Sequence, residues 1–299
     1  MQTPTLVLPV SPPRVPAPQG AARWLRAVRI VHPFPTLLNV AATAALSCVA
    51  AHGAPDAPLL GRMLLVMLLA QSAIGVANDY CDRALDAASK PWKPIAAGVV
   101  APRAALAAAC ALSAAAAITA ATLGAGGFAL AMLGMACGLV YDVRLKRSVF
   151  SAVPYMVAIP VLPLWVWTVL GAWRDALWWL LPLGALIGLA LHLANTLPDI
   201  DADAAHGVRG LAHRLGARGS MIAGWASFGA ALALSAAIAP LVRYDAAIYV
   251  PSAAFGAACL ALSIAAYALR RDGGALQFGF GLLGIGAAVL AAGWLAAVS

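Results

Sequence analysis

The sequence predicts an all-α, polytopic membrane protein with about nine transmembrane helices. Of the 299 residues, 63% are hydrophobic and 10% are charged, and the mean hydropathy of +0.89 lies far outside the range of soluble globular proteins. A helix needs about 20 consecutive apolar residues to cross a bilayer. Nine such segments can be drawn, approximately over residues 35–51, 59–77, 104–123, 126–141, 149–170, 176–197, 220–241, 247–269 and 275–298.

The distribution of positive charge predicts how these helices are oriented. Of the 19 Lys and Arg residues, all but Arg62, Arg174 and Arg243 lie in the N-terminal segment or in the even-numbered loops. Cytoplasmic loops carry the excess of Lys and Arg in membrane proteins. We therefore expect an inner (plasma) membrane protein with a cytoplasmic N-terminus and an external C-terminus. Because the basic residues sit at the ends of apolar runs, the net charge of +8 indicates topology and excludes nucleic acid as a partner.

The two ends of the chain differ in composition. Residues 1–25 are rich in proline and predict a disordered cytosolic tail, whereas residues 26–299 predict one membrane domain. The five cysteines are scattered without metal-ligand spacing, so we expect neither a thiol metal site nor a disulfide framework. Tryptophans cluster near the short loop around Arg174, where an interfacial aromatic belt explains them; they are Trp165, Trp167, Trp173, Trp178 and Trp179.

A polar stretch at residues 78–98 interrupts the apolar pattern after the second segment. If the helix continues through it, Asn78, Asp79, Asp82 and Asp86 fall within an arc of roughly 100° on one face. Carboxylates gathered in this way repel one another unless a cation lies between them, and oxygen ligands of this kind suit Mg²⁺.

Two lysines and two prolines follow these acids. The prolines must end the helix, which leaves both cations near the carboxylates. The residues concerned are Lys90, Pro91, Lys93 and Pro94.

A second polar stretch follows the sixth segment. Asn195, Asp199 and Asp203 are spaced by four residues and would share a helical face about 80° wide. Two acidic faces in one membrane chain indicate two metal-binding half-sites that meet across a helical bundle. Because each acidic stretch follows the second helix of a possible four-helix unit, the chain also hints at an internal repeat with a ninth helix added.

These residues carry a resemblance to a known family. The pattern Asn78-Asp79-x-x-Asp82-x-x-x-Asp86, followed by Lys-Pro-x-Lys-Pro, resembles the first aspartate-rich motif of the UbiA superfamily of intramembrane prenyltransferases. The run from Asp199 to Gly207 resembles the second motif, and the run from Tyr141 to Arg147 is similar to the basic motif between them. Three motifs at the expected span ends form a specific signal.

The resemblance implies nine transmembrane helices around a central cavity and a Mg²⁺-dependent enzyme. Such an enzyme transfers a prenyl group from a polyprenyl diphosphate to a lipophilic acceptor within the membrane, usually an aromatic ring, a quinone precursor or a tetrapyrrole. By position, the resemblance assigns Mg²⁺ to Asn78, Asp82, Asp199 and Asp203. It assigns support of the metal or polarisation of the acceptor to Asp79 and Asp86. The expected diphosphate-binding residues are Lys90, Lys93, Tyr141, Lys146, Arg147 and Asn195.

The chemistry of the residues agrees with this assignment. Breaking an allylic C–O bond requires neutralisation of charge on the leaving diphosphate, which metal ions and lysines supply. The allylic cation is quenched by water, so the cavity should be apolar and dry.

Departures from the family pattern leave the substrates open. Ala204 follows the second motif where the family often has Arg, and lysines replace two common arginines in the first, which loses bidentate geometry. The residues of the second motif are most similar to those of the chlorophyll-synthase, geranylgeranylglyceryl-phosphate and menaquinone branches of the family. Two alternatives remain: a terpene cyclase on the same scaffold, and a non-catalytic membrane transporter.

Overall fold

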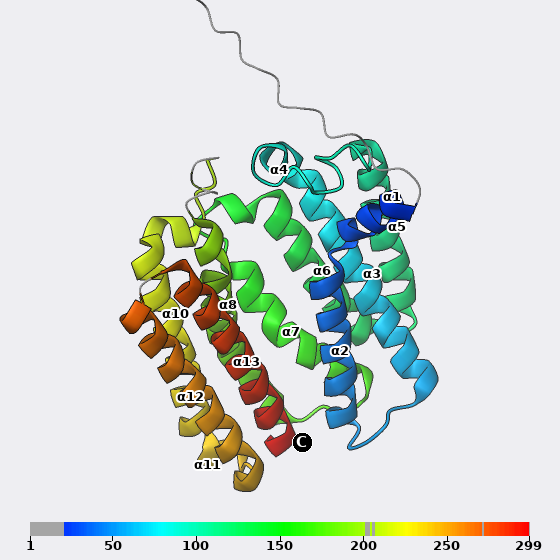
Figure 1. The fold of residues 1–299 in the computed structure, drawn as a ribbon. Helices are drawn as coiled ribbons and strands as arrows, with labels where there is room; N and C mark the ends of the chain where they lie inside the picture. The colour runs from blue at the N-terminus through cyan, green and yellow to red at the C-terminus, as the bar shows by residue number, and fades with distance from the viewer. Residues whose placement is uncertain (1–20, 201–203, 205–206, 271, 299) are drawn as a thin grey trace, which may run out of the picture.

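The computed structural model describes residues 21–200, 204, 207–270 and 272–298, and all regular structure in these ranges is helical (Figure 1). The long helices are α2 (Pro33–Ala50), α3 (Ala57–Cys81), α5 (Pro102–Ala121), α6 (Gly124–Val143), α7 (Val153–Val169), α8 (Leu180–Thr196), α10 (Leu211–Ala237), α12 (Ala246–Arg270) and α13 (Gly273–Val298). Within the described ranges, eight are long and apolar enough to cross a membrane, if the 3₁₀ helix η3 (Asp175–Trp179) is counted with α8, and α7 is a shorter apolar helix. The predicted all-α fold with about nine spans is confirmed.

Short helices connect the long ones. They are α1 (Ala21–Val28), η1 (Arg29–Val31), α4 (Arg83–Ser89), η2 (Leu145–Arg147), η4 (Leu197–Asp199) and α11 (Ala239–Val242). Of the expected N-terminal tail, residues 1–20 lie outside the described part of the chain, and residues 21–25 belong to α1.

The largest difference from the predicted boundaries is in α10, which begins nine residues earlier than expected. Gly216 interrupts it with φ +68° and ψ 170°, so that a short first turn is separated from the span proper. Glycine takes this conformation without steric penalty. The long apolar helix therefore starts after Gly216, close to the predicted start at residue 220.

The long helices form a closed arrangement. Helix α2 packs against α3, α7 and α13, α3 against α5 and α6, and α6 against α7. Helix α8 joins α7 to α10 and α13, while α12 pairs with α13. Figure 1 shows α4 and the C-terminal ends of α3 and α8 at the end of the bundle opposite the chain's C-terminus.

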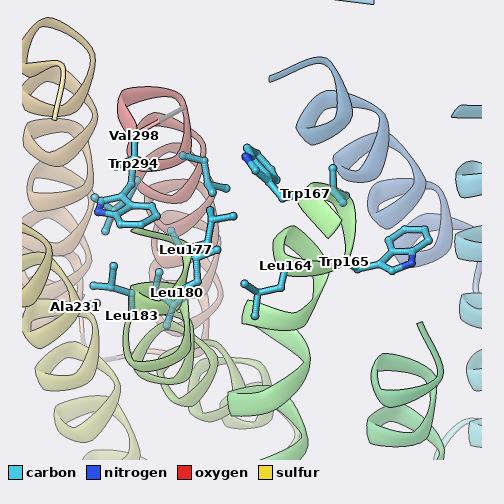
Figure 2. Close-up of a cluster of buried hydrophobic side chains, with 14 of the residues drawn as sticks. Leu164, Trp165, Trp167, Leu177, Leu180, Leu183, Ala231, Trp294 and Val298 are labelled. Carbon is cyan, nitrogen blue, oxygen red and sulfur yellow. The ribbon is translucent and has the colours of Figure 1, made fainter. Parts of the chain in front are cut away.

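Large aromatic side chains belong to a buried hydrophobic cluster near the C-terminal ends of α7 and α13 (Figure 2), and Figure 1 shows these ends opposite α4. Trp165, Trp167 and Trp294 are almost completely buried there, with Leu177 and Leu180. The predicted interfacial belt is therefore wrong for Trp165 and Trp167, because α7 turns them into the bundle. Trp173 and Trp178, in contrast, are exposed near the loop that follows α7.

Helices α7 and α8 approach each other closely. A Cβ atom on Gly188 would lie 2.5 Å from the carbonyl oxygen of Tyr155, and one on Gly184 would lie 2.6 Å from Cβ of Pro160. Small residues allow the backbones of membrane helices to approach in this way. The close approach fixes the α7 face that carries Tyr155 against the α8 face that carries His192.

Candidate functional site

Three residues of the first polar stretch, Asn78, Asp82 and Asp86, line a cavity of about 540 Å³. Asn78 lies in the last turn of α3, Asp82 in the turn that follows and Asp86 in α4. The N–H of Asp82 donates to the Asn78 carbonyl at 2.9 Å, and the N–H of Asp86 donates to the Asp82 carbonyl at 2.8 Å. Helical spacing therefore continues through the turn and keeps the three side chains on one face.

Asp79 is directed elsewhere. Its side chain is 1% exposed and it is not among the residues that line this cavity. Its Oδ1 atom lies 2.9 Å from Nε2 of His32 and 2.8 Å from Nζ of Lys93. Asp79 thus connects the start of α2, the end of α3 and the loop after α4, and it supports the site from behind its lining.

The loop after α4 returns Lys93 to the acids. Helix α4 ends at Ser89 because Lys90 precedes a proline, which disfavours helical geometry at that residue. Lys93 Nζ lies 2.8 Å from Oδ2 of Asp86 as well as from Asp79. Burial raises the pKa of the Asp86 carboxyl. Burial opposes the charged form of Lys93, but the hydrogen bonds that its ammonium group donates to the two carboxylates outweigh burial and raise the pKa of Lys93. Lys90 also lines the cavity.

The basic motif contributes a second lysine. The 3₁₀ helix η2 places Lys146 Nζ 2.5 Å from Oδ2 of Asp82. Lys146 and Tyr141 line the cavity, whereas Arg147 does not belong to its lining. The structure therefore brings five of the six predicted diphosphate-binding residues to one cavity and leaves Arg147 outside it.

The second polar stretch is described only in part. Asn195 lines the cavity, and its Nδ2 atom donates to the Tyr155 hydroxyl at 3.4 Å. Asp199 ends η4, but its side chain lies outside the described atoms, and Asp203 lies outside the described residues. The meeting of the two acidic faces therefore stays a prediction at these two positions.

A buried polar and aromatic cluster adds residues that were not predicted as site residues. His192 is 1% exposed, lines the cavity and has its Nε2 atom 3.0 Å from Oγ of Ser151. Ser151 also accepts a hydrogen bond from the N–H of Leu211. The rings of Tyr141 and Tyr155 lie 6.0 and 5.1 Å from the His192 ring, between centroids. His192 precedes Asn195 by three residues, and this helical spacing is the sequence signal for it.

Two further lining residues were missed. Asp142 is next to Tyr141 in the basic motif and accepts a hydrogen bond from Nδ2 of Asn78 at 2.7 Å. His32 lines the cavity from the start of α2 in a left-handed conformation, with φ 49°. Nothing in the sequence near His32 indicates its partner Asp79, which is 47 residues away.

The donor atoms on this wall fit Mg²⁺. Asn78, Asp82 and Asp86 offer amide and carboxylate oxygens, which are the ligands that Mg²⁺ prefers. One further carboxylate oxygen, Oδ2 of Asp142, is buried and has no hydrogen-bond partner among the described residues. Among the residues that the structure describes, no three His, Cys, Asp or Glu side chains form a metal-holding group by themselves.

An apolar groove of about 420 Å³ adjoins the cavity. It lies between α2, α7, α8 and α13, and it shares Asn39 and Ile159 with the cavity lining. Its other lining residues are almost all aliphatic. A polar cavity thus continues into a hydrocarbon-like groove, an arrangement that suits a molecule with a charged head and an apolar tail.

Comparison with known proteins identifies relatives of this bundle. Residues 38–285 match the UbiA prenyltransferase family. The chain is 31% identical over 179 residues to a digeranylgeranylglyceryl phosphate synthase of Methanoregula boonei, a match that covers 58% of this chain and 63% of the relative. It is 29% identical to the enzyme of the same name from Methanothrix thermoacetophila, covering 60% of this chain and 67% of the relative. The chain thus spans about two thirds of the length of these relatives.

Solved structures share the fold. A UbiA homologue from Archaeoglobus fulgidus, determined with GPP and Mg²⁺, superposes with a TM-score of 0.71 at 16% identity, covering 92% of this chain and all of the homologue. The apo structure of a homologue from Aeropyrum pernix gives a TM-score of 0.63 at 22% identity, with 84% and 96% coverage. These likenesses establish a common architecture.

Proposed function

The chain belongs to the UbiA prenyltransferase family, and we propose that it transfers a prenyl group from a polyprenyl diphosphate to a lipophilic acceptor and releases diphosphate. The observation that carries the proposal is the cavity lined by Asn78, Asp82 and Asp86, with Lys93 and Lys146 bound to its carboxylates. The adjoining apolar groove supports it, because an isoprenoid tail needs such a surface. The names of the relatives and the GPP of the Archaeoglobus structure support a diphosphate donor.

The reaction breaks one bond and forms another. The allylic C–O bond of the donor breaks, its electron pair leaves with the diphosphate, and the acceptor forms a new bond to the allylic carbon and loses a proton. Mg²⁺, held by Asn78, Asp82, Asp199 and Asp203, would neutralise the developing negative charge on the diphosphate. Lys93 and Lys146 would exchange their carboxylate partners for diphosphate oxygens. The Archaeoglobus homologue with bound Mg²⁺ supports the choice of metal.

For the acceptor, we propose an aromatic ring, such as a quinone precursor or a tetrapyrrole. Tyr141, Tyr155 and His192 present three rings along the cavity, within 5.1–6.0 Å of one another. Aromatic rings pack favourably at such distances. The names of the curated relatives favour a second candidate, a glyceryl phosphate lipid.

The test is an assay of purified protein in detergent with Mg²⁺, geranylgeranyl diphosphate and a panel of both acceptor classes. We expect acceptor-dependent release of pyrophosphate and a prenylated product. Asp82→Ala should lower kcat by about 10²–10³-fold, the loss typical of one electrostatic group in a reaction centre. Asp56→Asn, at the far end of α3, is the control and should retain activity.

Three other outcomes would contradict the proposal. Full activity in Asp82→Ala would place the site elsewhere. A cyclic product formed without any acceptor would indicate a terpene cyclase. Ion flux in proteoliposomes that Asp86→Asn abolishes would indicate a transporter.

We also propose the orientation given by the loop charges, in the plasma membrane. The basic loops and both acidic stretches would face the cytoplasm. A reporter enzyme that is active only outside the cytoplasm should function when fused after residue 299, and an inactive fusion would reverse the assignment.

A further inference from the structure

One hydrogen bond connects the first acidic stretch to a carboxylate that has no role in the scheme above. Asn78 in the last turn of α3 donates from Nδ2 to Oδ1 of Asp142 in the last turn of α6, at 2.7 Å. On the basis of the proposed function, in which Asn78 is a ligand of Mg²⁺, we propose that Asp142 is a positioning residue. It fixes the Asn78 amide so that the carbonyl oxygen, and not the NH₂ group, is available to the metal.

The chemistry of the two groups determines the direction of this bond. An ionised carboxylate only accepts hydrogen bonds, so the group of Asn78 that faces it is the NH₂. A length of 2.7 Å is typical of a hydrogen bond to an ionised acceptor. With the NH₂ held by Asp142, the Oδ1 atom of Asn78 lies on the other branch of the amide. Mg²⁺ binds amide oxygens and not amide nitrogens, so a flipped Asn78 would remove a ligand.

The surroundings of Asp142 distinguish it from the other acids of the site. Asp82 is paired with Lys146, and both Asp79 and Asp86 are paired with Lys93. Asp142 is 9% exposed, and within the described residues its Oδ2 atom has no hydrogen-bond partner.

Lys146 acts on Asp142 electrostatically, but no ion pair to Asp142 is seen among the described residues. Burying a carboxylate without a direct ion pair costs free energy, which an apolar residue at this position would avoid. Such local costs are expected where a side chain serves a site rather than stability. The bond to Asn78 is the polar contact that this carboxylate makes in the described part of the chain.

Metal binding, measured apart from catalysis, tests the proposal. Mn²⁺ takes the same kinds of oxygen ligand as Mg²⁺, and its free concentration is read from its electron paramagnetic resonance signal. The full-length protein in detergent is titrated with Mn²⁺ alone, without substrate. Asp142→Ala should weaken Mn²⁺ binding by about 10- to 100-fold, the loss typical when a partner of a metal ligand is removed.

A reciprocal exchange separates positioning from a general structural role. Asn78→Asp alone places two carboxylates side by side, and Asp142→Asn alone lets the Asn78 amide flip, so both should bind Mn²⁺ more weakly than wild type. In the double variant N78D/D142N, the introduced amide donates to one oxygen of the introduced carboxylate. The other oxygen then takes the place of the Asn78 carbonyl, and most of the affinity should return. This comparison also decides the matter if Asp142→Ala does not fold.

Three results would overturn the proposal. If Asp142→Ala binds Mn²⁺ like wild type while Asp82→Ala loses it, the metal site stands and Asp142 has no part in it. If the double variant binds no better than the single variants, the hydrogen bond does not position the ligand. If both Asp82→Ala and Asp142→Ala bind Mn²⁺ like wild type, this inference and the proposed metal site are both refuted. Asp56→Asn serves again as the control that should bind normally.

Discussion

Lys93 contacts two carboxylates at once and is a positive partner for both in the absence of a ligand. Its Nζ atom is 2.8 Å from both Asp79 and Asp86, and the lysine side chain is 19% exposed. Removing one partner of a buried ion pair leaves uncompensated charge, which typically costs about 3–5 kcal/mol. Lys93 is therefore important to stability as well as to the proposed chemistry.

The pH dependence of this contribution follows from the pKa of Lys93. The folded protein holds the pKa above its value in the unfolded chain, which is about 10.4. The stabilisation is therefore fully present below the unfolded pKa and is lost as pH rises through the folded pKa. Lys93→Met should lower the apparent melting temperature in detergent at pH 8, and the difference from wild type should shrink as pH rises through the raised pKa of Lys93. Exposed Arg103→Met should have little effect at either pH, and a Lys93→Met difference that persists at high pH would contradict the explanation.

For single residues, the sequence predicted which side chains share a helical face but not which residues they contact. The interval of four residues correctly placed Asn78, Asp82 and Asp86 on one cavity wall. The predicted arc of roughly 100° also grouped Asp79 with them, whereas the structure turns Asp79 towards His32 and Lys93. Helical periodicity fixes where a side chain points on its own helix, but the partner arrives from a distant segment, and that choice depends on tertiary packing.

The contact between α7 and α8 determines the shape of the cavity wall. Tyr155 on α7 and His192 on α8 lie with ring centroids 5.1 Å apart, and Gly188 allows the backbones to approach there. Any side chain at position 188 would meet the Tyr155 backbone, which cannot move without its helix.

Gly188→Ala should therefore push α7 away from α8. Overpacking of this kind typically costs about 1–3 kcal/mol. We expect a lower free energy of unfolding in detergent and a lower kcat, because the Tyr155 and His192 rings move apart. Gly281→Ala on α13 is a matched control, since its added methyl group would meet open space, and it should leave both quantities unchanged. Equal stability of the two variants would show that α7 and α8 are not tightly packed.

The positions of the helices were predictable because a long uninterrupted apolar segment is a strong signal for a membrane span. Most predicted ends lie within a few residues of those observed. The turn at Asp82 and the interruption at Gly216 were not predicted, because each is a single-residue departure within an otherwise helical run. The burial of Trp165 and Trp167 was missed for a related reason, since α7 is apolar on all sides and its sequence does not show which side faces lipid.

For the whole molecule, the connection between the polar cavity and the apolar groove determines which prenyl diphosphates fit. Asn39 and Ile159 belong to both linings, so a tail that starts at the acids runs towards α2 and α13. Ala288 lies on the α13 side of the groove and is exposed, so a large side chain there can fill the groove without disturbing the core.

Ala288→Trp should select against long donors. We expect turnover with dimethylallyl or geranyl diphosphate to remain near wild type, and turnover with geranylgeranyl diphosphate to fall by about tenfold or more, which corresponds to loss of roughly 1.4 kcal/mol of binding. Ile285→Trp, on an exposed face of α13 outside the groove, is the control. The same decrease for all donor lengths would show that the tail takes another route.

The overall arrangement was predictable from the sequence to a considerable degree. The helical fold and the span count agree with the structure, and Asn78, Asp82 and Asp86 of the first polar stretch line one cavity with Asn195 of the second. The predicted ligand role of Asp199 and Asp203 remains a prediction, because their side chains lie outside the described part of the chain. The identity of the acceptor was not predictable, because it depends on the fit of a cavity assembled from several helices.

The ion pairs that Lys93 and Lys146 form with the carboxylates affect how the protein behaves in a cell that lacks magnesium. Lys146 on Asp82 and Lys93 on Asp86 act as counterions within the chain, so we expect a newly inserted copy to fold without a divalent cation. Chelation by EDTA should leave the melting temperature unchanged while it stops turnover. A shortage of magnesium would then stop the reaction without lowering the amount of folded protein, and activity would return as soon as the ion was available again.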